Sequence, residues 1–106
     1  MKSLLIKFLA VSVFVLGSIN IVVAETTMRI SLQLPLKSHL GQNLLLFKKE
    51  VESRSNGDIK VEIYDSAQLY KDKEVPAAVG SGSIESGVAS LTRYVGDIPA
   101  VDLFYQ

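Results

Sequence analysis

The sequence has no cysteine and a single histidine, His39. The missing cysteine excludes a disulfide framework, a thiol nucleophile and the acylated cysteine of a lipoprotein. A zinc site would have to rely on carboxylates, because cysteine and histidine are the usual protein ligands of zinc, and no cluster with ligand spacing is present. We therefore predict no metal site, and no sequence motif indicates another cofactor.

An excess of charge of one sign is also missing, since eleven Lys and Arg residues balance eleven Asp and Glu residues. Lys2 and Lys7 lie in an apolar leader, and without them nine basic residues remain against eleven acidic ones. Such a balance gives no electrostatic footprint for nucleic acid or for an anionic membrane. We predict no nucleic-acid partner.

Residues 1–24 have the layout of a secretory signal peptide. Lys2 and Lys7 form a charged head, an apolar run follows at 8–16, and Val22-Val23-Ala24 supplies small residues at the cleavage point. A membrane anchor is the competing interpretation, but a glycine, a serine and an asparagine interrupt the run, and spanning a bilayer takes about 20 strongly apolar residues. The signal peptide predicts a protein outside the cytoplasm that is not inserted in the membrane after cleavage.

Residues 25–106 form the predicted mature chain, and about 80 residues is at the low end for a self-sufficient core. The sequence stops in the apolar and aromatic run Leu103-Phe104-Tyr105-Gln106, without a polar tail or a helix cap. We interpret this ending as that of an interrupted domain. Residues 25–106 are therefore expected to be part of one small domain, and to be marginally stable or aggregation-prone in isolation.

A strand, helix, strand pattern opens the mature chain. Apolar and polar residues alternate over 28–34, which is typical of a half-buried strand, and Pro35 ends it. Residues 39–54 predict an amphipathic helix with Leu40, Leu44, Phe47 and Val51 on its apolar face. Ser55-Asn56-Gly57 ends the helix, because Asn and Gly tolerate the left-handed conformation. Alternation at 59–64 predicts a second strand, and so the crossover of a parallel sheet.

The rest of the chain predicts a second helix and a third strand. Asp72 is the expected N-cap of a short helix over 74–79, and Gly80-Ser81-Gly82 ends it. Apolar residues at 88–91 predict a short strand, so the chain reads as βαβαβ, an α/β fold. Ligands of such sheets bind beyond the carboxyl ends of the strands. Three loops lie there: 33–39, 65–72 and 90–96.

Those loops and the first helix also carry a resemblance. The run FKKEVESRSNGDIKV at 47–61, followed by Ala67-Gln68-Leu69, resembles the amino-terminal lobe of solute-binding proteins of tripartite ATP-independent periplasmic (TRAP) transporters of the dicarboxylate type. The runs GSIESG at 82–87 and SLTRY at 90–94 continue it in the same order. The resemblance covers nearly the whole mature chain, and the ordered combination is far more specific than any one piece.

The resemblance implies a protein of two α/β lobes joined by a hinge. The lobes close around a small organic acid in the periplasm and hand it to the membrane permease subunits of a transporter, without catalysis. Family members are several times longer than this sequence, and their second lobe supplies the arginine that clamps the substrate carboxylate. The sequence is thus expected to be an amino-terminal fragment, one βαβαβ lobe with the second lobe absent.

Three residues are candidates for contact with the organic acid through their place in the motifs. Arg93 presents a planar fork that suits a carboxylate, although packing between lobes is an alternative. Gln33 ends the first strand and can both donate and accept, unless it is a plain outward-facing strand residue. Ser90 stands where relatives that bind sialic acid carry an acidic residue, which argues against that substrate and favours a simpler carboxylate.

For three further candidates, an ordinary structural role is an alternative to contact with the ligand. Tyr70 either lines the pocket or packs on a neighbouring helix, and relatives often have glycine there. Lys71 lies in a loop that contributes to the cleft edge in relatives, but it also fits a solvated helix start. His39 either caps the helix or lines the cleft. Without a recognisable nucleophile and orienting acid, it is weak evidence for catalysis.

Capture of an organic acid for transport is the leading hypothesis. A secreted hydrolase using His39 with Ser38 or Asp65 is an alternative, although no nucleophile elbow is present. A sensory or accessory binding module and a non-functional remnant are further alternatives. A second lobe downstream would indicate transport, whereas a membrane helix followed by signalling elements would indicate sensing. The identity of the acid is not predicted.

Overall fold

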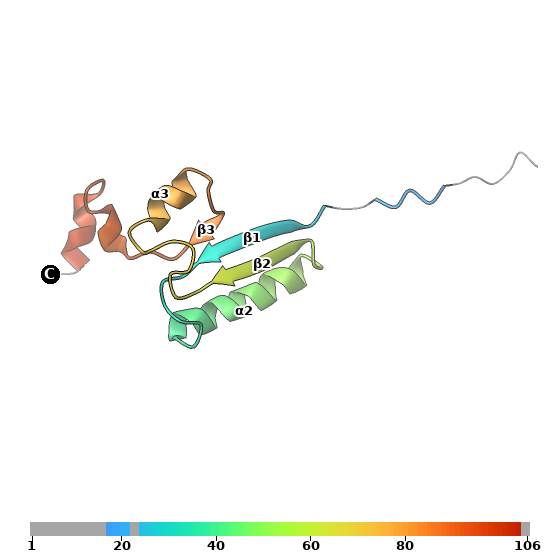
Figure 1. Cartoon of the computed structure of the whole chain (residues 1–106), viewed down its shortest axis with the longest axis horizontal. Coiled ribbons are helices and arrows are strands. Elements are labelled where there is room, and N and C mark those ends of the chain that lie inside the picture. Colours follow the sequence, from blue (N-terminus) through green and yellow to red (C-terminus); the bar gives the residue numbers. More distant parts are fainter. Residues whose placement is uncertain (1–16, 22–23, 105–106) are drawn as a thin grey trace, which may run out of the picture.

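The computed structural model describes residues 17–21 and 24–104. Three strands form a parallel sheet in the order β2-β1-β3, and helices connect them in sequence. The strands are β1 (Thr26–Ser31), β2 (Ile59–Tyr64) and β3 (Ser86–Gly87). The helices are α2 (His39–Arg54), α3 (Val75–Gly80) and the 3-10 helices η1 (Leu91–Tyr94) and η2 (Pro99–Phe104). The predicted α/β fold with a parallel sheet is confirmed (Figure 1).

The expected signal peptide lies largely outside the described residues, and it stays a prediction. Residues 17–21 and 24 have no regular secondary structure. Within the described ranges, no helix is long and apolar enough to cross a bilayer.

The centre of the sheet is the carboxyl end of β1. Ile30 and Leu32 are 2% and 0% exposed, and Ser31 between them is equally buried. The predicted half-buried strand is therefore wrong here. The loop after β2 covers Ser31, whose hydroxyl donates to the Tyr70 carbonyl at 3.4 Å, while the Val88 N–H donates to the Ser31 carbonyl at 2.9 Å.

β1 also ends earlier than the expected residue 34, because the next residues pair with a loop. The carbonyls of Leu32 and Leu34 accept the N–H groups of Ala67 and Ser66, at 3.0 and 3.1 Å. These partners belong to the β2–α3 loop rather than to a strand. The chain after β1 is thus held at the carboxyl edge of the sheet, where it turns towards α2.

α2 and β2 have the bounds predicted from the sequence. The Ser38 hydroxyl caps the helix by accepting the Gly41 N–H at 3.1 Å. The helix ends before Asn56 and Gly57, whose φ angles of 51° and 81° reverse the chain. Local signals therefore set both ends of α2, which lies along β2 on the side of the sheet away from α3 (Figure 1).

The predicted apolar face of α2 is only partly buried. Gly41 is the fully buried residue of this helix. Phe47 is 40% exposed and borders a hollow of about 470 Å³ with Val51 and Ile59. The second half of α2 and its C-cap consequently bind β2 through polar side chains, namely Lys48, Glu52 and Ser55.

The second half of the chain differs from the prediction at two elements. The N-cap of α3 is Glu74 and not Asp72, whose carboxylate is used elsewhere. The third strand is Ser86–Gly87, while residues 88–91 do not continue it. Strand pairing ends there because Ser90 caps η1, with its hydroxyl accepting the N–H two residues on.

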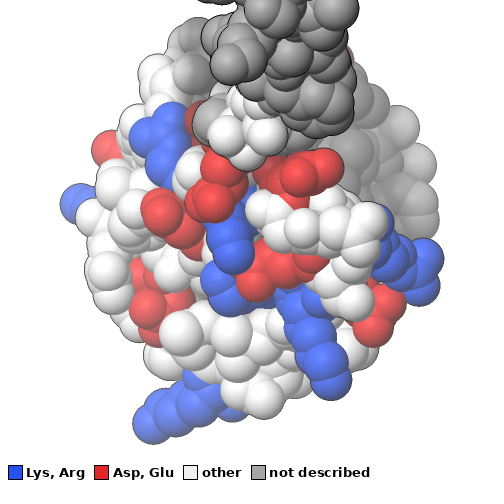
Figure 2. All heavy atoms as spheres, turned by 90° about the vertical axis from the view of Figure 1, so that its right-hand side faces the viewer, with Lys and Arg blue, Asp and Glu red and all other residues white. Residues whose placement is uncertain are grey.

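An ion pair fixes the start of β3 against β1. The Arg29 guanidinium contacts the Glu85 carboxylate twice, from Nη2 to Oε1 at 2.8 Å and from Nε to Oε2 at 2.9 Å. The Arg29 N–H donates to the same carboxylate at 2.9 Å. These hydrogen bonds lower the pKa of Glu85 from 4.5 to about 2. Acidic and basic side chains are intermixed on the face seen from the right of Figure 1 (Figure 2).

We expect this ion pair to make stability depend on pH in the acid range. A depressed pKa means that the unfolded state binds the proton more readily. The stabilisation is therefore fully present above the unfolded pKa of 4.5 and is lost as the pH falls to about 2. Thermal unfolding measured between pH 2 and 7 should give Glu85→Gln a lower Tm than the unmodified protein at pH 7. The Tm values of the two proteins should converge as the pH falls to 2.

The matched control is Glu50→Gln, since Glu50 also pairs with an arginine, Arg54, but through one contact at 3.1 Å on the exposed face of α2. This control should follow the unmodified protein at every pH. A gap between Glu85→Gln and the unmodified protein that stays constant from pH 7 to 2 would contradict the prediction.

Candidate functional site

The candidate site is the carboxyl edge of the parallel sheet, where three loops leave the strands. The loops are 32–38 after β1, 65–74 after β2 and 88–90 after β3. η1 and η2 follow the last of them, at the left of Figure 1. Two aspartates of the middle loop, Asp65 and Asp72, tie it to its neighbours on either side.

Asp65 joins the middle loop to the loop after β1. Its Oδ2 accepts the Leu36 N–H at 2.9 Å and the Ser66 hydroxyl at 3.0 Å, and its Oδ1 accepts the Gln68 amide at 3.2 Å. Ser66 and Ala67 adopt left-handed φ angles of 55° and 57°. Non-glycine residues take this conformation at a cost, so the bonds that they form with the β1 loop must offset it. One side of the site is therefore a firmly bonded loop pair.

Asp72 joins the middle loop to the segment after β3. It is 8% exposed, its Oδ1 accepts the Ser90 N–H at 3.0 Å, and its Oδ2 forms an ion pair with the Nε of Arg93. Burial alone would raise the pKa of Asp72, but the bonds from Arg93 and from the Ser90 N–H outweigh it and lower the pKa. Asp72 is thus a carboxylate that anchors an arginine.

Arg93 is held through the Nε of its guanidinium and is partly exposed. Its side chain is 45% exposed, and the contact with Asp72 uses Nε. A guanidinium carries five N–H donors in a fixed fork, so a contact through Nε leaves its Nη groups able to meet a planar anion. The buried partner fixes the direction of that fork.

Ser90 lies beside Arg93 and shapes the turn that carries it. Its hydroxyl lies 2.9 Å from the Thr92 hydroxyl and accepts the Thr92 N–H at 3.4 Å. Its own N–H goes to Asp72. Ser90 therefore contributes mainly by positioning η1.

Tyr70 and Lys71 precede Asp72 in the middle loop. Tyr70 borders a groove of about 750 Å³ together with Lys73 and Ala77 of the α3 region. The Lys71 N–H donates to the Glu74 carboxylate at 2.8 Å, and its side chain is exposed. This contact fits a helix start. Tyr70 and Lys71 directly precede Asp72, on the same loop.

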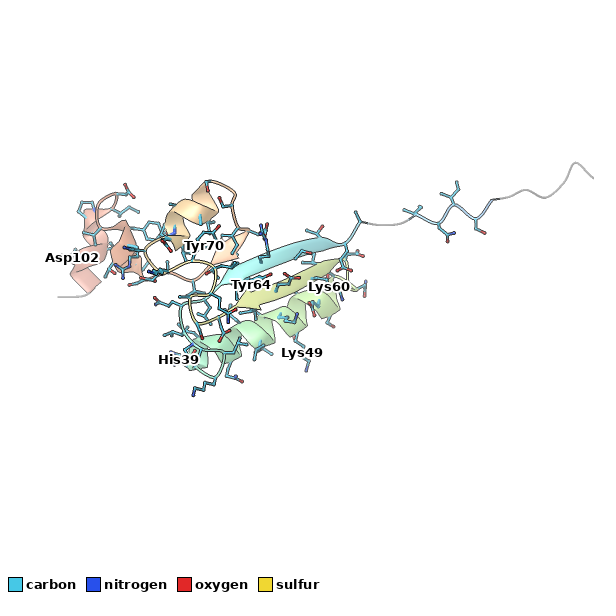
Figure 3. All side chains as sticks on the ribbon, viewed as in Figure 1. His39, Lys49, Lys60, Tyr64, Tyr70 and Asp102 are labelled. Carbon is cyan, nitrogen blue, oxygen red and sulfur yellow. The ribbon has the colours of Figure 1, made fainter. Side chains whose placement is uncertain are left out.

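Gln33 and His39 belong to the chain that follows β1, Gln33 in the loop and His39 at the start of α2. Both are exposed, and His39 is the first residue of α2. The expectation that His39 caps the helix is wrong, because Ser38 is the cap. In Figure 3, His39 lies at the α2 side of the molecule and Tyr70 at the α3 side. Of the six predicted residues, Ser90 and Arg93 are those that shared contacts with Asp72 bring together.

Sequence reasoning missed the organising roles of Asp65 and Asp72. Both follow the second strand in the loop at the carboxyl edge, and that position was the available signal. Within residues 17–21 and 24–104, no three His, Asp or Glu side chains come close enough to hold a metal ion. The Arg93 guanidinium, which is 45% exposed, offers positive charge and hydrogen-bond donors, and this chemistry suits a small anion.

Comparison with known proteins shows which family this chain matches. Residues 30–105 match the family described as bacterial extracellular solute-binding protein, family 7. A solute-binding protein of Verminephrobacter eiseniae is 40% identical over 83 residues, which is 76% of this chain and 25% of that protein.

Solved structures show the same fold. An extracytoplasmic solute receptor of Bordetella pertussis that binds pyroglutamic acid superposes with a TM-score of 0.70 and 29% identity, over 74% of this chain and 26% of that one. A TRAP periplasmic solute-binding protein of Sulfurospirillum deleyianum with bound succinate gives 0.69 and 25% identity, over 76% and 26%. The chain spans about a quarter of the length of these relatives. It belongs to the bacterial extracellular solute-binding protein family 7.

Proposed function

We propose that this protein is the extracytoplasmic solute-binding subunit of a TRAP transporter and that it captures a small organic acid for uptake. Residues 1–24 serve as its signal peptide, and residues 25–106 contribute part of its amino-terminal lobe. The observation that carries the proposal is the Arg93 guanidinium, 45% exposed at the carboxyl edge of the sheet and anchored by the buried Asp72.

The chemistry of Arg93 supports a carboxylate as the ligand. Hydrogen bonds between a guanidinium and a carboxylate are charge-assisted, and a fork in fixed orientation can bind both carboxylate oxygens. The solved relatives from B. pertussis and S. deleyianum hold pyroglutamic acid and succinate, and both ligands are carboxylates. A preoriented arginine loses little conformational freedom on binding, which favours affinity.

Closure of two lobes is the proposed mechanism. A ligand that bridges both lobes makes its full set of contacts only in the closed state, so binding shifts the population towards closure. The closed form then presents the acid to the membrane permease subunits. Residues 25–106 alone offer part of those contacts, and they should bind organic acids negligibly.

The other candidate residues take supporting parts in this proposal. Ser90 positions the turn that carries Arg93, and Tyr70 and Lys71 line the adjacent rim. Gln33 supplies a neutral donor and acceptor from the loop after β1. His39 is exposed at the first turn of α2, so its part would be at the α2 end of the cleft. We assign no residue a catalytic role. The hydroxyl that adjoins His39 in the sequence is that of Ser38, and it caps α2.

The test is calorimetric titration of the whole secreted protein with a panel of small acids, including succinate, malate and pyroglutamate. We expect one of these carboxylates to bind, and Arg93→Ala to weaken it by about 30-fold or more, because truncating one partner of a charge pair costs roughly 2–5 kcal/mol. Arg93→Lys should give an intermediate loss, since it keeps the charge but not the fork.

Arg54→Ala is the matched control, because this α2 arginine is 82% exposed and pairs within its own helix. It should bind as the unmodified protein does. Unchanged affinity in Arg93→Ala would show that Arg93 does not bind the ligand, but it would not contradict the proposed function. Failure of the unmodified protein to bind any acid of the panel would contradict the function itself.

A further inference from the structure

The outer edge of β2 is the feature from which we draw a further inference. One side of β2 pairs with β1, and no strand among the described residues pairs with its other side. The carbonyls of Asp58 and Tyr64 accept N–H groups from the β1 side, both at 2.9 Å. Because backbone groups alternate along a strand, the odd-numbered residues Ile59, Val61 and Ile63 direct theirs away from β1.

Side chains from α2 and its C-cap occupy these outward groups. The Glu52 carboxylate accepts the Val61 N–H at 3.0 Å, and the Lys48 ammonium donates to the Val61 carbonyl at 2.5 Å. The Ser55 hydroxyl accepts the Ile59 N–H at 3.1 Å. Positions 48, 52 and 55 recur at helical spacing, so they form one stripe that faces the strand edge.

The two charged members of the stripe also hold each other. Lys48 and Glu52 form an ion pair at 3.1 Å, with side chains 39% and 25% exposed. The Val61 N–H and then the Lys48 ammonium lower the pKa of Glu52. The carboxylate therefore stays ionised, and its bond to the backbone is charge-assisted.

We propose that Lys48, Glu52 and Ser55 form an edge guard that prevents the β2 strand of a second copy of this chain from adding to the sheet. A strand edge with free N–H and C=O groups is a template for pairing with another chain. Addition of a strand at Val61 would have to displace both charged side chains. Nothing in the transport proposal requires this stripe.

The sequence of β2 explains why identical copies are the partner to exclude. Ile59, Val61 and Ile63 alternate with Lys60, Glu62 and Tyr64. Six residues rich in β-branched and aromatic side chains, with no Pro or Gly and opposite charges that cancel, have the pattern of segments that stack in register between chains. Antiparallel addition centred on Val61 would place Lys60 of one copy opposite Glu62 of the other.

The test compares three variants of the whole protein. Glu52→Ala removes the acceptor for the Val61 N–H, whereas Glu52→Gln keeps an acceptor oxygen at the same length. Glu50→Ala removes an acid from the same helix whose carboxylate accepts a hydrogen bond from Arg54. We expect the Val61 amide to exchange with solvent at least about tenfold faster in Glu52→Ala, because a hydrogen bond to a charged group is lost.

Amides that pair with β1, such as those of Lys60 and Glu62, should exchange at unchanged rates, which separates loss of the guard from general loosening. Sedimentation velocity at rising concentration should show self-association of Glu52→Ala, while Glu52→Gln and Glu50→Ala stay as the unmodified protein. Lys48→Met keeps the apolar stem and removes the ammonium, so it repeats the test if Glu52→Ala does not fold.

Three results would overturn the proposal. One is an unchanged Val61 exchange rate in Glu52→Ala. The second is that Glu52→Ala remains in the association state of the unmodified protein at every concentration. Lys48→Met takes its place in this comparison if Glu52→Ala does not fold. The third is equal association of Glu50→Ala and Glu52→Ala, since this would mean that loss of any helix carboxylate drives self-association.

Discussion

Replacement of Gly41 by alanine is expected to destabilise the fold more than the same change at any other described glycine. Gly41 lies in the first turn of α2, and a Cβ atom built there would stand 2.6 Å from both the carbonyl carbon and the Cα of Leu36. Real Cβ atoms do not approach a backbone so closely. The clash is with backbone, so no rotation of a side chain can relieve it.

The path of the chain before α2 explains why this contact is tight. The Ser38 N–H donates to the Pro35 carbonyl at 2.9 Å, and the Gln42 amide donates to the Leu36 carbonyl at 3.0 Å. Loop and helix are therefore bonded across the space that a methyl group would need. We expect Gly41→Ala to lower the free energy of unfolding by at least about 3 kcal/mol, at the upper end for overpacking.

Urea denaturation of the whole protein, followed by circular dichroism, measures this loss. Gly80→Ala is the matched control, because Gly80 also lies in a helix and a Cβ there would meet nothing within 4 Å. It should be neutral or slightly stabilising, since alanine is the better helix former by about 1 kcal/mol. Equal midpoints for the two variants would mean that the loop can move off the helix at no cost.

Removal of the Asp72 carboxylate is expected to have the second largest effect. Asp72→Ala leaves the Ser90 N–H without its acceptor and Arg93 without its buried partner. A lost hydrogen bond to a charged group costs roughly 1.5–3 kcal/mol, and the pair with a half-exposed arginine adds about 1 kcal/mol or less. We expect a total loss of about 2–3 kcal/mol in the free energy of unfolding.

Asp72→Asn should lose about half as much, because the amide oxygen can still accept the Ser90 N–H but carries no charge. Asp58→Asn is the control, since the side chain of Asp58 is exposed. Urea denaturation gives the energies, and hydrogen exchange at the Ser90 amide reports the local bond. If Asp72→Ala has the same urea denaturation midpoint as Asp58→Asn, the Asp72 carboxylate contributes nothing to the free energy of unfolding.

The elements that could be predicted from the sequence are those with local signals. The bounds of α2 and β2 are confirmed, because Ser38 caps the helix and Asn56 and Gly57 end it. These residues act on backbone groups within a few positions, so spacing along the chain contains the information. The family resemblance is confirmed as well, because residues 30–105 match the solute-binding protein family.

The elements that could not be predicted depend on partners far along the chain. Asp72 stands two residues before Glu74 and looks like a helix cap, but its partners, Ser90 and Arg93, are 18 and 21 residues away. The apolar residues at 88–91 look like a strand, whereas the observed strand is a serine and a glycine. Gly87 suits that place because a Cβ there would collide with the Val75 side chain.

The edge guard also bears on the order in which the fold forms. Thr26 of β1 pairs with Ile59 of β2, whereas Ile30 pairs with Ser86 of β3, much farther along the chain. Closing the shorter loop costs less conformational entropy, so we expect β1, α2 and β2 to assemble first. The stripe of α2 belongs to that early unit. β2 therefore meets its helix before the rest of the sheet exists, and its edge is covered at the stage when partly folded chains are most prone to stick together.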